Sequence, residues 1–284
     1  MRSEDIKYVI IQAGGKGIRM GRYAENKPKC LVPVKGIPMI MNTIEKYKDK
    51  KIIIIADYKA DVLEAYLTNF CKHNFTVCQT TEQGTAGGLA KVMDSIPDDE
   101  PFILTWADLF FEETPEFDFN KDLLVGLSDT FKCRWKLENN KFVNEASTEV
   151  GVAGFFAFKN KERFNKLSIS KSLVRGFLSE NYKYSEIDSF TLSNCFEVGE
   201  VDKYESILVN ELNHRFFNEV IIDGDKVTKR CIDSRYEDVH SKEKLWYSAV
   251  SDRLENIPKI YSYDPLTMGR ICLLYTSDAA DEST

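Results

Sequence analysis

The fold is decided by one stretch near the N-terminus, VIIQAGGKGIRMGRYAENKPKCLVPV, residues 9–34. An apolar β-branched run leads there into three closely spaced glycines, an arginine and a Lys-Pro-Lys. Glycine lets the backbone turn sharply and approach a ligand without a Cβ in the way. Consecutive backbone N–H groups in such a turn form a concave anion site. The stretch therefore predicts a buried strand followed directly by a loop that binds phosphate.

Outward from this stretch, strand-like runs alternate with segments of helical length. The strand-like runs cover residues 7–13, 50–57 and 101–108, and the helix-length segments cover 38–48, 61–72 and 85–94. This alternation indicates a parallel sheet with right-handed crossovers. Further strand-like runs beyond Asp108, followed by a helix-length segment at 161–180, indicate a mixed sheet, so we expect a Rossmann-like α/β fold. Such sheets bind ligands at the carboxyl ends of their strands, where the glycines and Asp108 lie.

The composition argues against several classes of protein. The net charge of −7 argues against nucleic-acid and anionic-membrane partners. The seven cysteines form no C-x-x-C pair, and reduced thiols are typical of a cytoplasmic protein. No run reaches the roughly 18 apolar residues of a membrane span, and the N-terminus lacks the apolar core of a signal peptide. The oligomeric state cannot be read from the sequence.

Two common phosphate-binding motifs do not fit the glycine stretch. A P-loop requires Lys followed by Ser or Thr, but Lys16 is followed by Gly17. A dinucleotide fingerprint requires a third glycine where Met20 stands, and Asp57 lies far beyond the expected acidic spacing of about 20 residues.

A third pattern fits throughout: G-x-G-x-R followed by P-K, matched by Gly15, Gly17, Arg19, Pro28 and Lys29. On these residues the chain resembles the nucleotidyltransferase superfamily that makes nucleoside-diphosphate sugars and related activated alcohols. The resemblance implies transfer of a nucleoside monophosphate from a triphosphate to a phosphorylated acceptor, with release of pyrophosphate. It also implies that Arg19 and Lys29 are catalytic, Arg19 on the β- and γ-phosphates and Lys29 near the α-phosphate.

The same resemblance assigns the remaining nucleotide contacts to two segments. The predicted nucleotide-binding residues are Gln12, Ala13, Gly14, Gly15 and Gly17, followed by Gln83, Gly84, Thr85 and Ala86. Thr85 also fits a simple role as the N-cap of a helix. Gln12 stands where a small or aliphatic residue is more usual, which leaves the nucleotide base open.

Magnesium and the acceptor are implied by matches further along the chain. Asp108 matches the position that holds catalytic magnesium, and Glu197 matches a second metal carboxylate that is more often Asp. Glu149 and Gly154 match an acceptor-binding strand. We therefore expect a magnesium site at Asp108 and Glu197.

Three segments are expected along the chain: a nucleotidyltransferase domain at 1–212, a second module at 213–271 and a non-native tail at 272–284. The second module resembles the start of an aminoglycoside-phosphotransferase or choline-kinase-like domain, with Lys229 as its nucleotide lysine and Glu243 as the partner of that lysine. No H-x-D-x-x-x-x-N catalytic loop follows, so no kinase activity is expected. The Asp223-Gly224-Asp225 turn between two alternating runs predicts a hairpin in this module. An ordinary hairpin and helix appendage is the alternative.

The function expected first is the transfer of a nucleotide to a sugar 1-phosphate, for cell-surface polysaccharide precursors. Three alternatives stay open: a phosphocholine cytidylyltransferase-like enzyme, a GT-A glycosyltransferase and a non-catalytic nucleotide-sugar sensor. Release of pyrophosphate distinguishes the two nucleotidyltransferase functions from the glycosyltransferase and the sensor.

Overall fold

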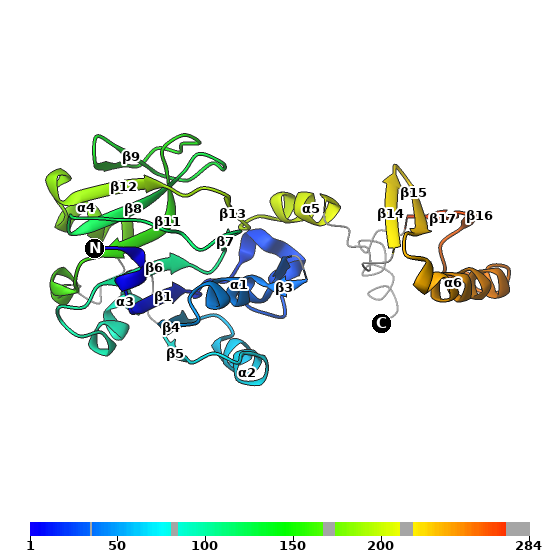
Figure 1. Ribbon diagram of the computed structural model, residues 1–284, viewed down its shortest axis with the longest axis horizontal. Helices are drawn as coiled ribbons and strands as arrows, with labels where there is room; N and C mark the ends of the chain where they lie inside the picture. Colours follow the sequence, from blue (N-terminus) through cyan, green and yellow to red (C-terminus); the bar gives the residue numbers. More distant parts are fainter. Residues whose placement is uncertain (35, 81–84, 167–173, 211–217, 271–284) are drawn as a thin grey trace, which may run out of the picture. The chain divides into compact units, whose positions relative to one another are not determined.

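The computed structural model describes residues 1–34, 36–80, 85–166, 174–210 and 218–270. The chain divides into two compact units, Met1–Ser206 and Ile207–Thr284, which are described separately (Figure 1). The predicted boundary between residues 212 and 213 lies outside the described residues, and so does the predicted tail at 272–284.

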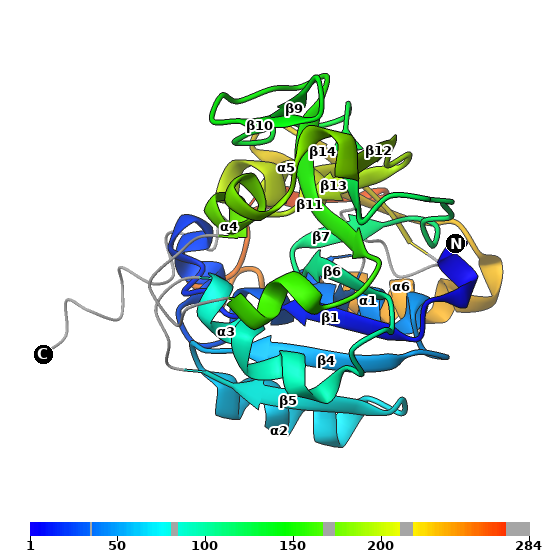
Figure 2. The ribbon, with the colours of Figure 1, turned by 90° about the vertical axis from the view of Figure 1, so that its left-hand side faces the viewer.

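The first unit is built on a mixed sheet of nine described strands. Its parallel half has the order β5-β4-β1-β6, in which the strands are β1 (Tyr8–Gln12), β4 (Lys51–Ala56), β5 (Phe75–Gln79) and β6 (Phe102–Trp106). Figure 2 shows β1, β4 and β5 side by side. The α/β fold with a mixed sheet that the sequence predicts is confirmed. Strand β5 was not predicted, because its half-exposed residues lack the apolar run of a central strand.

Antiparallel pairing extends the sheet beyond β6. The strands concerned are β8 (Leu123–Ser128), β9 (Lys136–Glu138), β10 (Lys141–Val143), β11 (Gly151–Phe158) and β12 (Ile187–Thr191). Strand β11 is antiparallel to both β6 and β8, and β12 is parallel to β8. The edge continues from β11 through β9 to β10.

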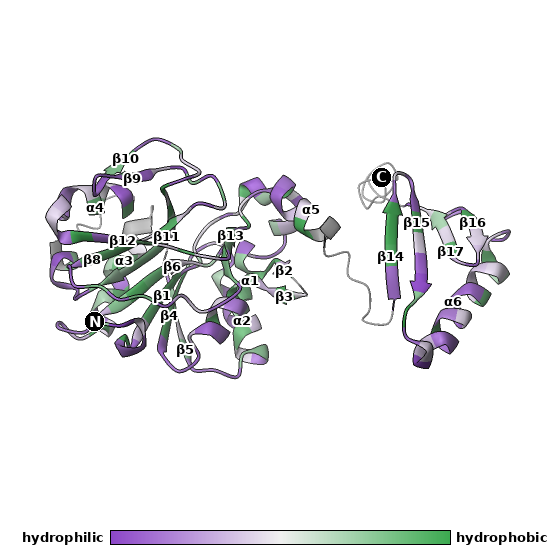
Figure 3. Cartoon of the chain, turned by 45° about the horizontal axis from the view of Figure 1, so that its top comes forward, coloured by the Kyte–Doolittle hydropathy of each residue, from purple (hydrophilic) through white to green (hydrophobic). Residues whose placement is uncertain are grey.

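Helices cover both faces of the sheet. The helices are α1 (Met39–Lys46), α2 (Ala60–Phe70), α3 (Thr85–Val92) and α4 (Val174–Asn181). Val9 and Ile11 of β1 pack with α1 and α2, whereas Tyr8 and Ile10 pack with α3 and α4. Because successive strand residues point to opposite faces, a strand covered on both sides is apolar throughout. Figure 3 shows this hydrophobic colouring along the central strands.

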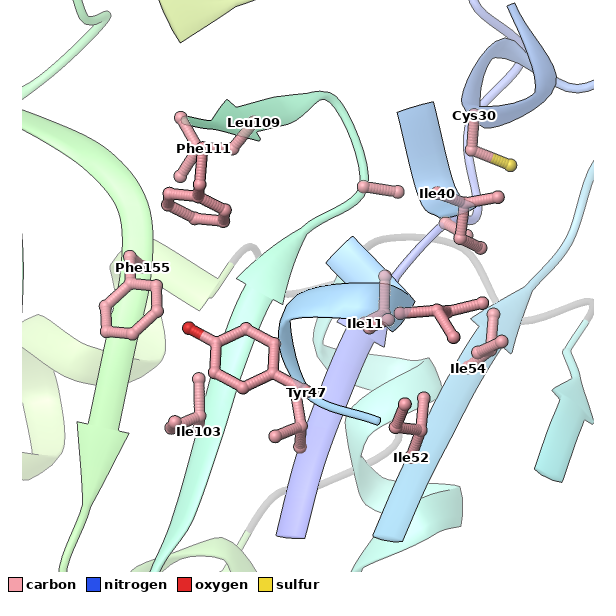
Figure 4. Packing of buried hydrophobic residues seen from close by; sticks show 14 of the residues in the cluster. Ile11, Cys30, Ile40, Tyr47, Ile52, Ile54, Ile103, Leu109, Phe111 and Phe155 are labelled. Atoms are coloured by element: carbon pink, nitrogen blue, oxygen red, sulfur yellow. The ribbon is translucent and has the colours of Figure 1, made fainter. Parts of the chain in front are cut away.

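The core next to the site is dense in isoleucine. Ile11, Ile52, Ile54 and Ile103 come from three neighbouring strands and belong to one buried cluster with Ile40 of α1 (Figure 4). Burying an aliphatic side chain of this size contributes about 1.5–3 kcal/mol. This packing holds the strand ends in fixed positions.

Three parallel strands end at one edge of the sheet. Gln12, the last residue of β1, pairs in register with Ile55 of β4 and with Trp106 of β6. The glycine stretch and Asp108 therefore leave the sheet side by side, although they are far apart in the sequence.

A two-stranded ladder beside this edge brings in the predicted second carboxylate. Strands β7 (Leu109–Phe111) and β13 (Cys195–Glu197) pair antiparallel, with Glu197 opposite Leu109. The N–H of Val198 donates to the carbonyl of Asp108 at 3.0 Å. Glu197 thus lies next to Asp108, just before helix α5 (Val201–Asn210). A second short pair joins β2 (Pro33–Val34) and β3 (Ile37–Pro38).

One predicted helix is shorter than expected. The helical segment expected over residues 161–180 contains a 3-10 turn at Glu162–Lys166 and helix α4, and residues 167–173 lie outside the described chain. Among the described residues, no helix has the length and apolar character needed to cross a membrane.

The second unit is a four-stranded antiparallel sheet with one helix. The strands are β14 (Asn218–Asp223), β15 (Lys226–Cys231), β16 (Ile260–Tyr263) and β17 (Leu266–Gly269), in the order β14-β15-β17-β16. The predicted hairpin is confirmed, with Gly224 at φ 53° in its turn. Helix α6 (Glu237–Val250) contacts β15 and β16. Lys229 of β15 donates to the carboxylate of Glu243 on α6, the pairing that the sequence predicted.

Candidate functional site

A cavity of about 420 Å³ opens at the carboxyl ends of the parallel strands. It is lined by residues 12–19, Lys29, residues 106–108, Arg134 and Gly199, among others. The predicted catalytic cations Arg19 and Lys29 therefore share one cavity with Asp108 and with the glycine loop. Buried sheet residues fix the ends of β1 and β6, and the glycine loop that follows β1 lines the cavity beside them.

The glycine loop requires glycine at one position for a conformational reason. Gly17 has a φ of 64°, a conformation that side chains other than glycine rarely adopt. A Cβ there would lie 3.0 Å from the Cβ atoms of both Ala24 and Lys29. A Cβ at Gly15, in contrast, would meet no other atom within 4 Å. Gly17 thus shapes the loop, whereas Gly15 leaves open space in the cavity.

Gln12 stands at the floor of this cavity. Its side chain is only 8% exposed, and its Oε1 has no hydrogen-bond partner among the described residues. A buried carbonyl oxygen without a partner is costly. It is suited to a ligand that can donate a hydrogen bond.

Lys29 is held against Asp108 at the centre of the site. Pro28, with φ fixed at −64°, leads into a short 3-10 turn that begins at Lys29. The Lys29 Nζ donates to Asp108 Oδ2, and both side chains are less than one-fifth exposed. Burial raises the pKa of the neighbouring Cys30 thiol to about 12, so this cysteine stays neutral beside the ion pair.

Arg19 is more exposed and contacts two carboxylates. Its guanidinium donates to Glu200 and lies 3.8 Å from Glu197 Oε1. Glu197 also accepts from Lys203 at 3.1 Å. A Cβ at Gly199 would overlap the Glu197 carboxylate, so glycine is required for Glu197 to take this position. Arg19, Glu197 and Lys203 thus form a row of alternating charges that begins at the cavity.

A second cavity of about 150 Å³ adjoins the first. Its walls include Trp106, residues 131–135, residues 152–154 and Glu197. Gly154, at φ 94°, brings the backbone close to the Trp106 ring, because a Cβ there would lie 3.1 Å from the ring. Aromatic rings from Trp106, Phe131 and Trp135 make this cavity markedly more aromatic than the first.

Not all predicted site residues are brought together. Glu149 is exposed, lies at neither cavity and has its N–H bound by Ser147 Oγ at 3.1 Å. Gln83 and Gly84 lie outside the described residues. Thr85 and Ala86 begin helix α3, but their side chains lie outside the description. The roles of these residues stay predictions.

Several cavity residues were missed by sequence reasoning. They are Lys16, Ile18, Cys30, Trp106, Phe131, Lys132, Arg134 and Trp135. Trp106 carries a usable signal, because it ends a strand directly before the predicted metal carboxylate. Residues 131–135 carry none, because they belong to a loop after an antiparallel strand and match no motif.

Asp108 and Glu197 offer the hard oxygen ligands that magnesium prefers. The described residues contain no group of three or more ligand side chains. Magnesium in nucleotide-binding sites commonly takes one or two carboxylates and fills its other positions with phosphate oxygens and water. Asp108 and Glu197 both line the second cavity and lie on neighbouring backbone segments, which fits that arrangement.

Comparisons with known proteins agree with this geometry. Residues 9–115 match the family model of the MobA-like NTP transferase domain. The bifunctional protein GlmU of Methanocaldococcus jannaschii is 32% identical over 111 residues, which are 38% of this chain and 26% of that protein. The glucose-1-phosphate cytidylyltransferase of Salmonella typhimurium is 28% identical over 126 residues, covering 35% of this chain and 49% of that protein.

A solved structure extends the likeness to most of the first unit. The CTP:phosphocholine cytidylyltransferase LicC of Streptococcus pneumoniae matches with a TM-score of 0.56 and 19% identity, covering 71% of this chain and 98% of that chain. The chain spans 26% and 49% of the two curated relatives. The sequence matches show that residues 9–115 are similar to an NTP transferase domain, and the structural likeness shows the fold.

Proposed function

We propose that this chain transfers a nucleoside monophosphate from a nucleoside triphosphate to a phosphorylated small-molecule acceptor. The acceptor is a sugar 1-phosphate, and the product serves cell-surface polysaccharide synthesis. The observation that carries the proposal is the single cavity that holds the glycine loop, Arg19, Lys29 and Asp108. The match of residues 9–115 to an NTP transferase domain supports the same conclusion.

In the proposed reaction an oxygen of the acceptor phosphate forms a bond to the α-phosphorus. The bond from the α-phosphorus to its bridging oxygen breaks, and pyrophosphate leaves with the electron pair. Such a transfer depends on positioning and charge neutralisation rather than on covalent chemistry by the protein. This chemistry suits a cavity lined by bare backbone and cations.

Arg19 takes the β- and γ-phosphates in this proposal. Its pairs with Glu200 and Glu197 are partly exposed, and such pairs contribute only about 0–1 kcal/mol. Charge-assisted hydrogen bonds to phosphate contribute about 1.5–3 kcal/mol each. The triphosphate therefore displaces the carboxylates from the guanidinium.

Lys29 neutralises the charge that grows on the α-phosphoryl group. Its ammonium is held in place by Asp108 and by the turn that follows Pro28. Gln12 accepts a hydrogen bond from the nucleotide through its unpaired Oε1. Asp108 and Glu197 would hold magnesium, which would supply positive charge to offset the negative charge of the phosphates.

The aromatic second cavity favours a second candidate acceptor, phosphocholine. Trp106, Phe131 and Trp135 line that cavity, and indole faces attract quaternary ammonium groups through cation–π contacts. The likeness to the phosphocholine cytidylyltransferase LicC supports this candidate. The glucose-1-phosphate cytidylyltransferase relative supports a sugar phosphate.

The second unit is proposed to be the start of a kinase-like N-lobe. The Lys229–Glu243 pair between β15 and α6 supports this proposal, because kinases pair a strand lysine with a helix glutamate. In the proposed organisation, residues 213–271 do not take part in nucleotide transfer.

Pyrophosphate release tests the proposed function. The purified chain is incubated with magnesium, each of ATP, CTP, GTP, UTP and dTTP, and each of glucose 1-phosphate, a heptose 1-phosphate and phosphocholine. We expect release only when one triphosphate and one acceptor are present together. Release no faster than that of Lys29→Met with every pair would refute the proposal, and would favour a glycosyltransferase or a nucleotide-sugar sensor.

A further inference from the structure

Arg134 lies where the two cavities meet. Only four residues line both cavities, namely Arg19, Trp106, Asp108 and Arg134, among the described residues. Arg19 is paired with carboxylates, and Asp108 is paired with Lys29. Arg134 forms no hydrogen bond or ion pair within the part of the chain that the structure describes. A full positive charge is therefore available at the junction.

The backbone around Arg134 is fixed on both sides. Cys133 N–H donates to Ser147 O at 2.8 Å, and Ser147 N–H donates back to Cys133 O at 3.1 Å. Trp135 O accepts from Val152 N–H at 2.9 Å. The exposed arginine thus extends from an anchored loop, and its side chain can bind a ligand without ordering the backbone first.

The chemistry at this junction calls for a second cation. In the proposed reaction the acceptor phosphate must come within about 3–3.5 Å of the α-phosphorus, and a phosphomonoester carries about −1.5 to −2 charge at pH 7. The two anionic groups repel one another. Arg19 and Lys29 are committed to the triphosphate in this scheme, so the acceptor phosphate needs a cation of its own.

We propose that Arg134 binds the acceptor phosphate and holds it in line for attack on the α-phosphorus. The inference rests on the proposed function. The planar guanidinium offers paired donors that match two phosphate oxygens. Its place between the cavities puts it beside the triphosphate on one side and the aromatic acceptor cavity on the other.

A matched control lies two residues away. Lys132 is also exposed and lines the second cavity, but it does not line the first. Lys132→Gln removes one positive charge from the same loop, as Arg134→Gln does. A general loss of positive potential would weaken acceptor binding equally in both variants, whereas a phosphate contact at the junction would make the loss much larger in Arg134→Gln.

The experiment uses the full chain and the triphosphate and acceptor pair that gives the fastest pyrophosphate release in the panel above. kcat and both KM values are measured for the wild type, Arg134→Gln, Arg134→Lys and Lys132→Gln. We expect Arg134→Gln to raise the KM for the acceptor by about 10- to 100-fold, the loss expected for charge-assisted hydrogen bonds. The KM for the triphosphate should change less than about threefold, Arg134→Lys should recover part of the loss, and Lys132→Gln should raise the KM for the acceptor much less than Arg134→Gln does.

Two results would overturn the inference while leaving the proposed function in place. One is an acceptor KM for Arg134→Gln that equals that of the wild type. The other is an equal rise of both KM values, which would place Arg134 on the triphosphate instead. If the wild type releases no pyrophosphate with any pair, the proposed function itself fails and the inference falls with it.

Discussion

Two lysine–carboxylate pairs of this chain differ in their surroundings. In the first unit Lys29 donates to Asp108, and in the second Lys229 donates to Glu243. The side chains of the first pair are 15% and 17% exposed, and those of the second are 26% and 30% exposed. Among the described residues, only the first pair lines the cavities at the strand ends. A lysine–carboxylate pair therefore forms part of a binding site only where the surrounding backbone also forms a cavity.

The two units also differ in the packing behind these pairs. Helix α2 of the first unit buries Ala60, Leu63 and Leu67, whereas His240 is the only fully buried side chain of α6. Leu245 and Trp246 of α6 are more than half exposed. A densely packed sheet fixes the strand ends that carry the first pair. The smaller sheet of the second unit leaves the second pair near solvent.

The largest expected effect is a difference in turnover between substitutions of Lys29 and Lys229. Lys29→Met should lower the rate of pyrophosphate release by at least about 10²–10³-fold, because loss of one preorganised charge contact typically has that effect. Lys229→Met should leave the rate within about twofold and lower the stability by about 0–1 kcal/mol, as for other partly exposed pairs. Turnover assays of both variants measure the rate of pyrophosphate release, and unfolding followed by circular dichroism measures their stability. Equal loss of turnover in both would show that the second unit takes part in the reaction.

The next largest effect separates two roles of glycine in the loop: Gly17 sets the loop conformation, and Gly15 leaves space in the cavity. Gly17→Ala forces a side chain into the left-handed region and toward Lys29, so it should lower the free energy of unfolding by about 1–2 kcal/mol and weaken triphosphate binding. Gly15→Ala should leave stability unchanged, because a Cβ there meets no protein atom. It should still raise the KM for the triphosphate if phosphate approaches the bare backbone.

Urea unfolding and triphosphate KM are measured on both glycine variants. The contrast fails if Gly15→Ala binds triphosphate as the wild type does, since the open space at that position would then not be used. It also fails if Gly17→Ala is as stable as the wild type.

The predictable part of the site depends on parallel strands. Gln12 and Trp106 lie in register because neighbouring parallel strands end at one edge, so motifs on separate strands meet there. The glycine loop and Asp108 could be placed at one edge of the sheet from the sequence for this reason. The hairpin turn at Gly224 and the Lys229–Glu243 pair were predicted by local chemistry and by a resemblance.

The rest depends on long-range contacts that no local pattern encodes. Arg134 reaches the site only because Cys133 pairs with Ser147 across a loop. Glu149 matches the acceptor-binding motif only loosely, and the turn at Ser147 leaves it exposed outside both cavities. Glu200, which contacts Arg19, matches no motif because its role depends on where α5 begins.

The smallest expected effect concerns an ion pair of the first unit that lines neither cavity. Glu186 accepts from Arg163 at 2.8 Å and from the Lys183 N–H at 2.7 Å. These hydrogen bonds, that from Arg163 first, lower the pKa of Glu186 from 4.5 to about 2. A lowered pKa contributes stability that is fully present above pH 4.5 and is lost as the pH falls toward 2.

Glu186→Gln should therefore destabilise the first unit by less than about 1 kcal/mol at pH 7, and its difference from the wild type should shrink below pH 4.5. Urea unfolding is followed by tryptophan fluorescence in a Trp246→Phe background, so that the signal comes from Trp106 and Trp135 of the first unit. Glu180→Gln is the control, because Glu180 is exposed and has no ion pair among the described residues. If the difference in free energy of unfolding between Glu186→Gln and the wild type stays constant from pH 7 to pH 3, Glu186 stabilises the fold by packing rather than by charge. Glu186 would then not be a charge pair comparable with Lys29–Asp108 and Lys229–Glu243. The difference between those two lysine pairs would rest on the cavity alone.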